Sequence, residues 1–161
     1  MSKEGLNKVK EMAKDIDFCM FVTQEEDDTL RSRPMSTTQV DDNGTMWFFT
    51  DEYSGKVDEF QDNRSVNLAY SKISGQDYLS VSGKASLVTN QDKIRQLWSP
   101  MLKVWFPDGL ETEGLALIKV TPTKAEYWDS SSSKIVQLFQ AGRALLTGQT
   151  MEAGEHAKVT L

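Results

Sequence analysis

The sequence predicts a mainly β fold, a six-stranded antiparallel β-barrel with short flanking helices. Six segments are rich in β-branched and aromatic residues and are bounded by turn-forming residues. Most of these segments follow one another as the strands of hairpins do, and closing such strands into a barrel removes their exposed edges. The alternation of strands with helices that a doubly wound α/β fold requires is missing.

Turn and capping residues set the expected bounds of the elements. The acidic segment 25–28 and the run Asp41-Asp42-Asn43-Gly44 favour hairpin turns. Asn90 is suited to cap the N-terminus of a helix that extends through Trp98, and turns and loop are expected over 99–114. The strands are therefore expected over 16–24, 30–40, 45–50, 65–73, 78–89 and 115–128, and the helices over 2–14, 54–61, 91–98 and 135–146.

A chain of 161 residues has room for one domain with a hydrophobic core. We expect this domain to occupy residues 1–147. The segment 148–161 is polar and lacks a periodic apolar face, which predicts a frayed, disordered tail. Cys19 alternates with Phe21 on its strand, so its thiol is expected to be buried and unreactive.

Composition argues against several classes of function. The net charge of −6 argues against a nucleic-acid partner, which would need a basic surface. Cys19 is the only cysteine and His156 the only histidine, so an internal disulfide, a zinc cluster or a Ser-His-Asp triad lacks the residues it needs. No apolar run reaches the roughly 20 residues that span a bilayer. The N-terminus lacks the apolar core of a signal peptide, and we expect a cytoplasmic protein without a membrane partner.

Arg31 and Arg33 are two residues apart on a predicted strand and therefore point to the same face. Adjacent guanidinium groups repel each other unless an anion lies between them, and arginine matches the oxygens of a phosphate. A solvated strand face balanced by Asp27 and Asp28 is the simpler alternative. Pro34 lacks a backbone donor, so a bulge at Pro34-Met35 or an edge strand is expected there.

The segment Ser54-Gly55-Lys56 follows a strand and begins a predicted helix. A helix N-terminus offers unpaired N–H groups and a positive dipole end. A lysine is unfavourable against that dipole, so Lys56 indicates an anionic ligand. The alternative is an ordinary capped helix that carries a surface lysine.

Large aromatic residues concentrate in the second half of the chain. The pair Trp105-Phe106 falls in an expected loop, which is an unusual place for two large rings. The aromatic residues there could cover a flat ligand, fill a dimer interface or close the mouth of the barrel. Plain core packing is an equal alternative.

Five short motifs follow one another in a characteristic order. They are Arg-Ser-Arg-Pro-Met (31–35), Trp-Phe-Phe-Thr (47–50), Ser-Gly-Lys (54–56), Tyr-Leu-Ser-Val-Ser-Gly (78–83) and Glu-Tyr-Trp-Asp (126–129). Their order and spacing resemble those of the general stress proteins, a branch of the FMN-binding split barrels related to pyridoxamine-phosphate oxidase. The resemblance covers roughly residues 5 to 145.

This resemblance implies a homodimer with FMN in the clefts between two split barrels. It assigns the flavin phosphate to the side chains of Arg31, Arg33, Ser54 and Lys56. It assigns the isoalloxazine ring and the ribityl chain to positions along two strands, which are Pro34, Met35, Phe49 and Thr50. By the same resemblance Trp105 and Trp128 are walls of the flavin pocket.

The function implied by the resemblance is that of an FMN-dependent oxidoreductase of unknown substrate, with a nicotinamide as electron donor. The flavin would carry the redox chemistry, and no catalytic side chain is expected. A non-catalytic flavin carrier or redox sensor is the alternative, and a cofactor-free barrel that binds a partner protein is a third. Oxidation of pyridoxamine phosphate is not expected, because Tyr78 stands where those oxidases have a glutamine and residues 149–161 contain no arginine.

Overall fold

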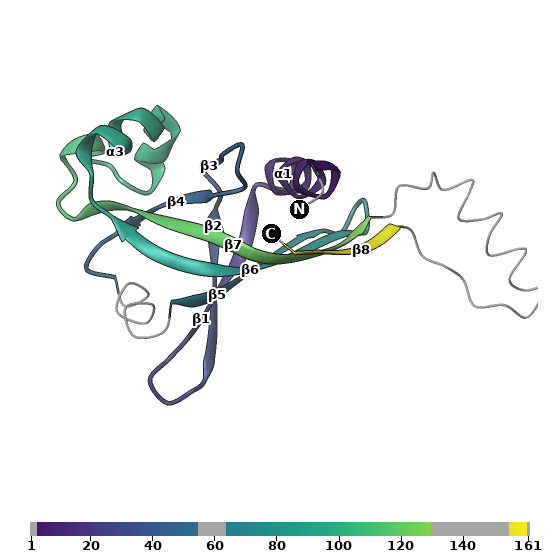
Figure 1. Ribbon diagram of the computed structural model, residues 1–161. Helices are drawn as coiled ribbons and strands as arrows, with labels where there is room; N and C mark the ends of the chain where they lie inside the picture. The colour runs from purple at the N-terminus through teal and green to yellow at the C-terminus, as the bar shows by residue number, and fades with distance from the viewer. Residues whose placement is uncertain (1–2, 55–63, 130–154, 161) are drawn as a thin grey trace, which may run out of the picture.

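Antiparallel strands form one curled sheet in the computed structural model, which describes residues 3–54, 64–129 and 155–160 (Figure 1). Within these residues the strand order is β2-β1-β5-β6-β7-β4-β3, and β8 pairs with β7. Every pairing is antiparallel, which confirms the predicted mainly β, antiparallel class. The strands are β1 (Phe18–Gln24), β2 (Leu30–Ser36), β3 (Gln39–Val40), β4 (Met46–Asp51), β5 (Ser65–Lys72), β6 (Asp77–Val88), β7 (Leu115–Asp129) and β8 (Glu155–Thr160).

The predicted strand over 30–40 is divided into two strands. β2 pairs with β1, whereas β3 pairs with β4 at the other end of the strand order. The chain changes partner at Thr37 and Thr38, whose N–H groups donate to the carbonyls of Asp17 and Trp47. Since only two residues join the two ends of the sheet, the sheet must curl until those ends approach each other. This change of partner gives the sheet its split-barrel form.

The core of the barrel lies between strands that are not neighbours in the sheet. Phe21 of β1 packs edge-on against Phe48 of β4, with ring centroids 5.5 Å apart. The helix α1 (Lys3–Ile16) covers the interior beside the curled sheet, and its Val9, Met12 and Ala13 are buried in the same core (Figure 1). This helix corresponds to the one predicted over 2–14.

Ion pairs fix the middle and the C-terminal end of α1 to the sheet and to the turn between β3 and β4. Lys8 pairs with Asp129 of β7, Lys10 Nζ lies 2.7 Å from Asp42 Oδ1, and Lys72 Nζ lies 2.5 Å from Asp15 Oδ2. The Lys10–Asp42 and Lys72–Asp15 pairs have exposed carboxylates and contribute about 0–1 kcal/mol each, so burial of the apolar face of α1 supplies more of its docking energy than these pairs do.

A second, smaller core lies on the opposite face of β4. Trp47 and Phe49 of β4 pack there with Ile94 and Leu97 of α3 (Gln91–Leu97). Two 3-10 turns, η1 (Pro100–Val104) and η2 (Gly109–Glu111), follow α3. Asn90 caps α3 as predicted, because its side chain accepts a hydrogen bond from Lys93 N at 2.9 Å.

Residues 155–160 form β8, which pairs with β7 from Lys124 to Asp129, so the prediction of a frayed tail over 148–161 is wrong for these residues. Residues 148–154 and 161 lie outside the described residues. Because β8 is held by its pairing with β7, the segment forms a strand without an alternating apolar pattern of its own. The predicted helix over 135–146 and all but the first residue of the one over 54–61 lie outside the described residues, so they stay predictions.

The thiol of Cys19 is buried, as predicted. Burial raises the pKa of the thiol to about 12, and a hydrogen bond with Tyr70 opposes that shift. Among the described residues no helix is long and apolar enough to cross a membrane.

Candidate functional site

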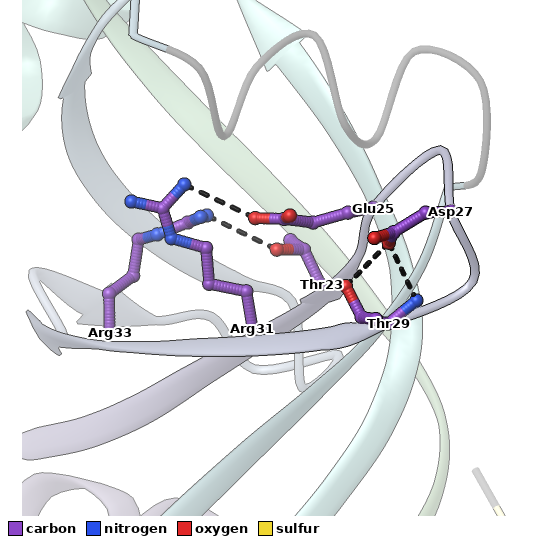
Figure 2. A network of polar contacts seen from close by, with 6 residues as sticks. All are labelled: Thr23, Glu25, Asp27, Thr29, Arg31 and Arg33. Atoms are coloured by element: carbon purple, nitrogen blue, oxygen red, sulfur yellow. Dashed lines mark hydrogen bonds and ion pairs between the residues drawn. The ribbon is translucent and has the colours of Figure 1, made fainter.

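Arg31 and Arg33 lie on β2, which is an edge strand of the sheet. Figure 2 shows their side chains rising side by side from β2, with the two guanidinium groups next to each other. Arg33 Nη1 donates to Thr23 Oγ1 at 3.2 Å, and Arg31 Nη1 lies 3.2 Å from Glu25 Oε1. The predicted common face is thus confirmed, and both groups are held by residues of β1 and the turn that follows it.

The turn between β1 and β2 is held by its own hydrogen bonds. Glu25 N donates to Thr29 O at 2.8 Å, and Asp28 N donates to Glu25 O at 3.0 Å. The carboxylate of Asp27 accepts from Thr29 N at 3.0 Å and from Thr29 Oγ1 at 2.5 Å. These hydrogen bonds with Thr29 lower the pKa of the Asp27 carboxyl. The backbone that presents Glu25 to Arg31 is therefore fixed (Figure 2).

Thr50 and Ser54 lie where β4 ends. Thr50 is buried, and its Oγ1 lies 3.3 Å from Ser54 Oγ. The backbone turns sharply here, because Ser54 N donates to Asp51 O at 3.1 Å and Tyr53 N donates to Asp51 Oδ1 at 2.8 Å. Ser54 is therefore positioned by the buried end of β4. Lys56 lies outside the described residues, and its place in the site stays a prediction.

Two rows of buried side chains relate the arginines to Ser54. On β1 the inward residues are Cys19, Phe21 and Thr23, and on β4 they are Met46, Phe48 and Thr50. Phe21 contacts Phe48, and Tyr70 Oη, which bonds to the Cys19 thiol, lies 3.8 Å from Met46 Sδ. These contacts match the two rows at two successive levels, and successive inward residues of a strand lie about 6.6 Å apart. The two rows therefore run in the same direction. Thr23 and Thr50 therefore lie toward the same end of the interior.

This end of the barrel thus gathers polar groups from separate parts of the sequence. Thr23 accepts from Arg33, and Thr50 bonds to Ser54. An open cleft begins beside Thr23 and extends across the outer sides of β1, β5 and β6. The cleft is lined by hydroxyl, amide and aliphatic groups and by one lysine, which are Val22, Thr23, Gln24, Leu30, Ser65, Val66, Asn67, Ser82, Gly83, Lys84 and Thr123.

Pro34 and Met35 occupy a regular part of β2. The β1–β2 register runs without a shift from Phe18↔Ser36 to Gln24↔Leu30, so the bulge considered at Pro34-Met35 is wrong and the edge-strand alternative is right. An edge strand tolerates a proline because one of its sides pairs with no neighbour. Met35 is buried in the core, so only its backbone is accessible to a ligand.

Phe49 faces away from the interior row of β4. Its ring packs against Trp98 and Phe106, with centroids 5.6 Å and 6.2 Å away, in the second core. The side chain therefore helps to fix α3 and η1 on β4, and only the backbone of Phe49 continues toward the site at Thr50.

Trp105 and Trp128 do not meet the arginines within one chain. Trp128 pairs with Tyr78 at the start of β6. Thr23 lies farther along the sheet, because its neighbour Val22 is opposite Asn67 of β5, which in turn is opposite Ser82 of β6. Trp105 is 58% exposed and lies 6.4 Å from the ring of Phe18, at the opposite end of β1 from Thr23. Their role as pocket walls stays a prediction.

Thr23 and Glu25 are parts of the site that the motif comparison missed. Thr23 bonds to Arg33 across the β1–β2 pairing, and Glu25 contacts Arg31 from the turn that joins the two strands. A signal for Thr23 was present, since it is the polar end of an otherwise apolar alternating row. In the described part of the chain, no three His, Cys, Asp or Glu side chains are grouped to hold a metal ion.

Comparison with known proteins adds the family context. Residues 4–152 match the family described as pyridoxamine 5'-phosphate oxidase like. Protein bli-3 of Neurospora crassa is 30% identical over 129 residues, which is 74% of this chain but only 62% of that protein.

Solved structures share the fold over most or all of the chain. A protein assigned as general stress protein 26 in Jannaschia sp. CCS1 superimposes with a TM-score of 0.80 at 23% identity, covering 99% of this chain and 100% of that one. The general stress FMN/FAD binding protein of Xanthomonas citri superimposes with a TM-score of 0.70 at 27% identity, covering 82% of this chain and 93% of that one.

Proposed function

Because this chain belongs to the pyridoxamine 5'-phosphate oxidase like family, we propose that it is a general-stress-type flavoprotein that binds FMN. One observation carries the proposal. The hydroxyls of Thr23 and Thr50 lie toward one end of the interior, and each is bonded to a residue suited to phosphate, Arg33 and Ser54 respectively. The relative in Xanthomonas citri, which is named for FMN and FAD binding, supports a flavin as the ligand.

The described residues fit the phosphate of FMN. The guanidinium groups of Arg31 and Arg33 supply directed positive charge, which matches phosphate oxygens through paired N–H donors. Ser54 adds a hydroxyl from the turn after β4, and Lys56 is proposed to add a second kind of cation. The backbones of Pro34, Met35 and Phe49 would then border the ring and the ribityl chain.

When bound, the flavin would supply the redox chemistry, and the protein would orient it and exclude water. The proposed activity is that of an oxidoreductase with a nicotinamide electron donor. The described site residues are arginines, hydroxyls and one partly exposed glutamate, and this set includes no thiol or imidazole for proton transfer near neutral pH. The same site would serve a non-catalytic flavin carrier or redox sensor, which is the second candidate function.

The absorption spectrum tests the proposal. Protein purified without added cofactor, then mixed with FMN, should show the visible bands of a protein-bound flavin and quench flavin fluorescence. Addition of NADH or NADPH under anaerobic conditions should bleach these bands if the protein is a reductase. Retention of the bands with both donors would favour the carrier, and no binding of FMN would remove the proposed function.

Substitution of Arg33 tests where the phosphate binds. A hydrogen bond to a charged group contributes about 1.5–3 kcal/mol. Arg33→Ala should therefore weaken FMN roughly 10- to 150-fold, at about 1.4 kcal/mol per decade. Riboflavin has the same ring without the phosphate, and its affinity should change much less. Equal losses for both ligands in fluorescence titrations would place the phosphate elsewhere.

A further inference from the structure

We propose that Glu25 occupies the place of the flavin phosphate at Arg31 when the site is empty, and that it thereby sets the affinity for phosphorylated flavins. This inference rests on the proposed function and identifies a residue outside the motifs that the resemblance assigns. Glu25 would act as an internal competitor, which the phosphate must displace before Arg31 can bind it.

The geometry of the ion pair points to an exchangeable contact. Glu25 Oε1 lies 3.2 Å from Arg31 Nη1, and the side chains are 34% and 61% exposed, respectively. Figure 2 shows the Glu25 carboxylate beside the guanidinium groups, on the side to which they extend from β2. An oxygen acceptor there already satisfies a donor that the phosphate would use. The contact is exposed, so breaking it costs little.

The charges make simultaneous occupation unfavourable. A phosphate monoester carries about −1.5 to −2 charges at neutral pH. A phosphate bound to Arg31 while Glu25 stays in contact would bring two like charges within a few ångströms of each other, which destabilises both. The Glu25 side chain therefore has to rotate away when the phosphate binds.

The turn confines this movement to the side chain. The Glu25 backbone is bonded on both sides, with its N–H donating to Thr29 O and its carbonyl accepting from Asp28 N. Asp27 closes the same turn through its two hydrogen bonds with Thr29. Arg33 stays with Thr23, which is buried, so the phosphate meets one arginine that is already oriented and one that must be released by Glu25.

Competition of this kind lowers the apparent affinity of the site for the phosphate in proportion to the fraction of time that Glu25 leaves Arg31 accessible to it. Glu25→Gln keeps the size of the side chain and removes its charge, so it should tighten FMN by about 2- to 5-fold at low ionic strength, where charge interactions are least screened. Glu25→Ala should tighten FMN as well. Riboflavin affinity should stay within about 2-fold of wild type, since riboflavin has no phosphate to compete with the carboxylate.

Glu26→Gln is the matched control, because it removes the same charge from the neighbouring, exposed position of the same turn. Titrations of FMN and riboflavin by flavin fluorescence would compare wild type with the three variants. Equal gains for Glu25→Gln and Glu26→Gln would overturn the inference in favour of a long-range charge effect. Weaker FMN binding by both Glu25 variants would overturn it too, since Glu25 would then be orienting Arg31 for the phosphate. If wild type bound no FMN at all, the proposed function would fail along with it.

Discussion

Cys19 is predicted to be buried from its alternation with Phe21, and in the folded protein this burial changes the pKa of its thiol. Its thiol is 3% exposed, and burial raises its pKa to about 12. An unfolded thiol has a pKa near 8.5, about three and a half units lower. The unfolded chain therefore releases this proton first as the pH rises, so the contribution of Cys19 to stability is complete below about pH 8.5 and is lost between that pH and about 12.

This difference predicts an alkaline loss of stability that Cys19→Ala reduces. A single proton released on unfolding changes the free energy of unfolding by about 1.4 kcal/mol per pH unit. The wild-type value should fall more steeply than that of Cys19→Ala between pH 9 and 11. Burial, with a smaller contribution from Cys19, also raises the pKa of Tyr70, so a second but weaker slope should remain in the variant. Urea unfolding at several pH values measures both slopes, and identical slopes would contradict the assignment.

The positions of the two arginines could be predicted from the sequence, whereas their contacts could not. The common face of Arg31 and Arg33 follows from their spacing on a strand, and the structure confirms it. The link between Arg31 and Glu25 depends on the turn that reverses the chain, and the link between Arg33 and Thr23 depends on cross-strand register. No local sequence pattern predicts either contact. The motifs therefore identify the arginines but miss the residues that bind their side chains.

Among the elements, the β6–β7 pair contains an irregularity that depends on one glycine. The register shifts between Ser82 and Gly83, where the two longest strands of the described sheet meet. A Cβ atom at Gly83 would lie 2.6 Å from the Thr121 carbonyl oxygen and 3.1 Å from Pro122 Cα. Both neighbours are backbone atoms of a paired strand, so they cannot move aside independently.

Gly83→Ala should therefore destabilise the protein by about 1–3 kcal/mol, the usual cost of overpacking a tight site. Gly75→Ala is the control, because Gly75 lies in a turn and the atoms that its Cβ would meet belong to the side chain of Asp77 at the start of β6, which can rotate. Denaturant unfolding of the two variants provides the comparison. Equal midpoints would show that β7 adjusts to the added methyl group.

Elements that are defined by local interactions could be predicted from the sequence, and elements that are defined by pairing with a distant strand could not. The strands β1, β4, β5, β6 and β7 and the cap of α3 carry local signals, and the structure has them close to the predicted bounds. The division of 30–40 into β2 and β3 arises because the chain leaves β1 and joins β4, and β8 exists through its pairing with β7. These features require knowledge of the neighbouring strand, which no single segment contains.

At the scale of the whole molecule, the outer face of β1 indicates how two barrels would meet. Phe18 and Met20 are 47% and 41% exposed on this face, and the exposed ring of Trp105 lies beside Phe18. Neighbouring apolar side chains of this size on the surface of a small domain are typical of protein interfaces. A two-fold dimer would bring each copy of this face against the other. It would also allow Trp105 or Trp128 of one chain to approach the site of the other, which a single chain does not achieve.

The last prediction is that the protein is a homodimer with the outer face of β1 in its interface. Light scattering at micromolar concentration should give twice the chain mass of 18.2 kDa. Met20→Lys places a charge on the proposed interface, where its desolvation is costly, and should shift the mass toward the monomer. Ile73→Lys makes the same kind of change at an isolated apolar residue in the β5–β6 turn, 82% exposed, and should leave the mass unchanged. Because the family resemblance implies flavin clefts between two barrels, Met20→Lys should also weaken FMN in proportion to the dimer lost. A wild-type mass near that of one chain would exclude the homodimer, and a dimer that persists in Met20→Lys would move its interface to another face.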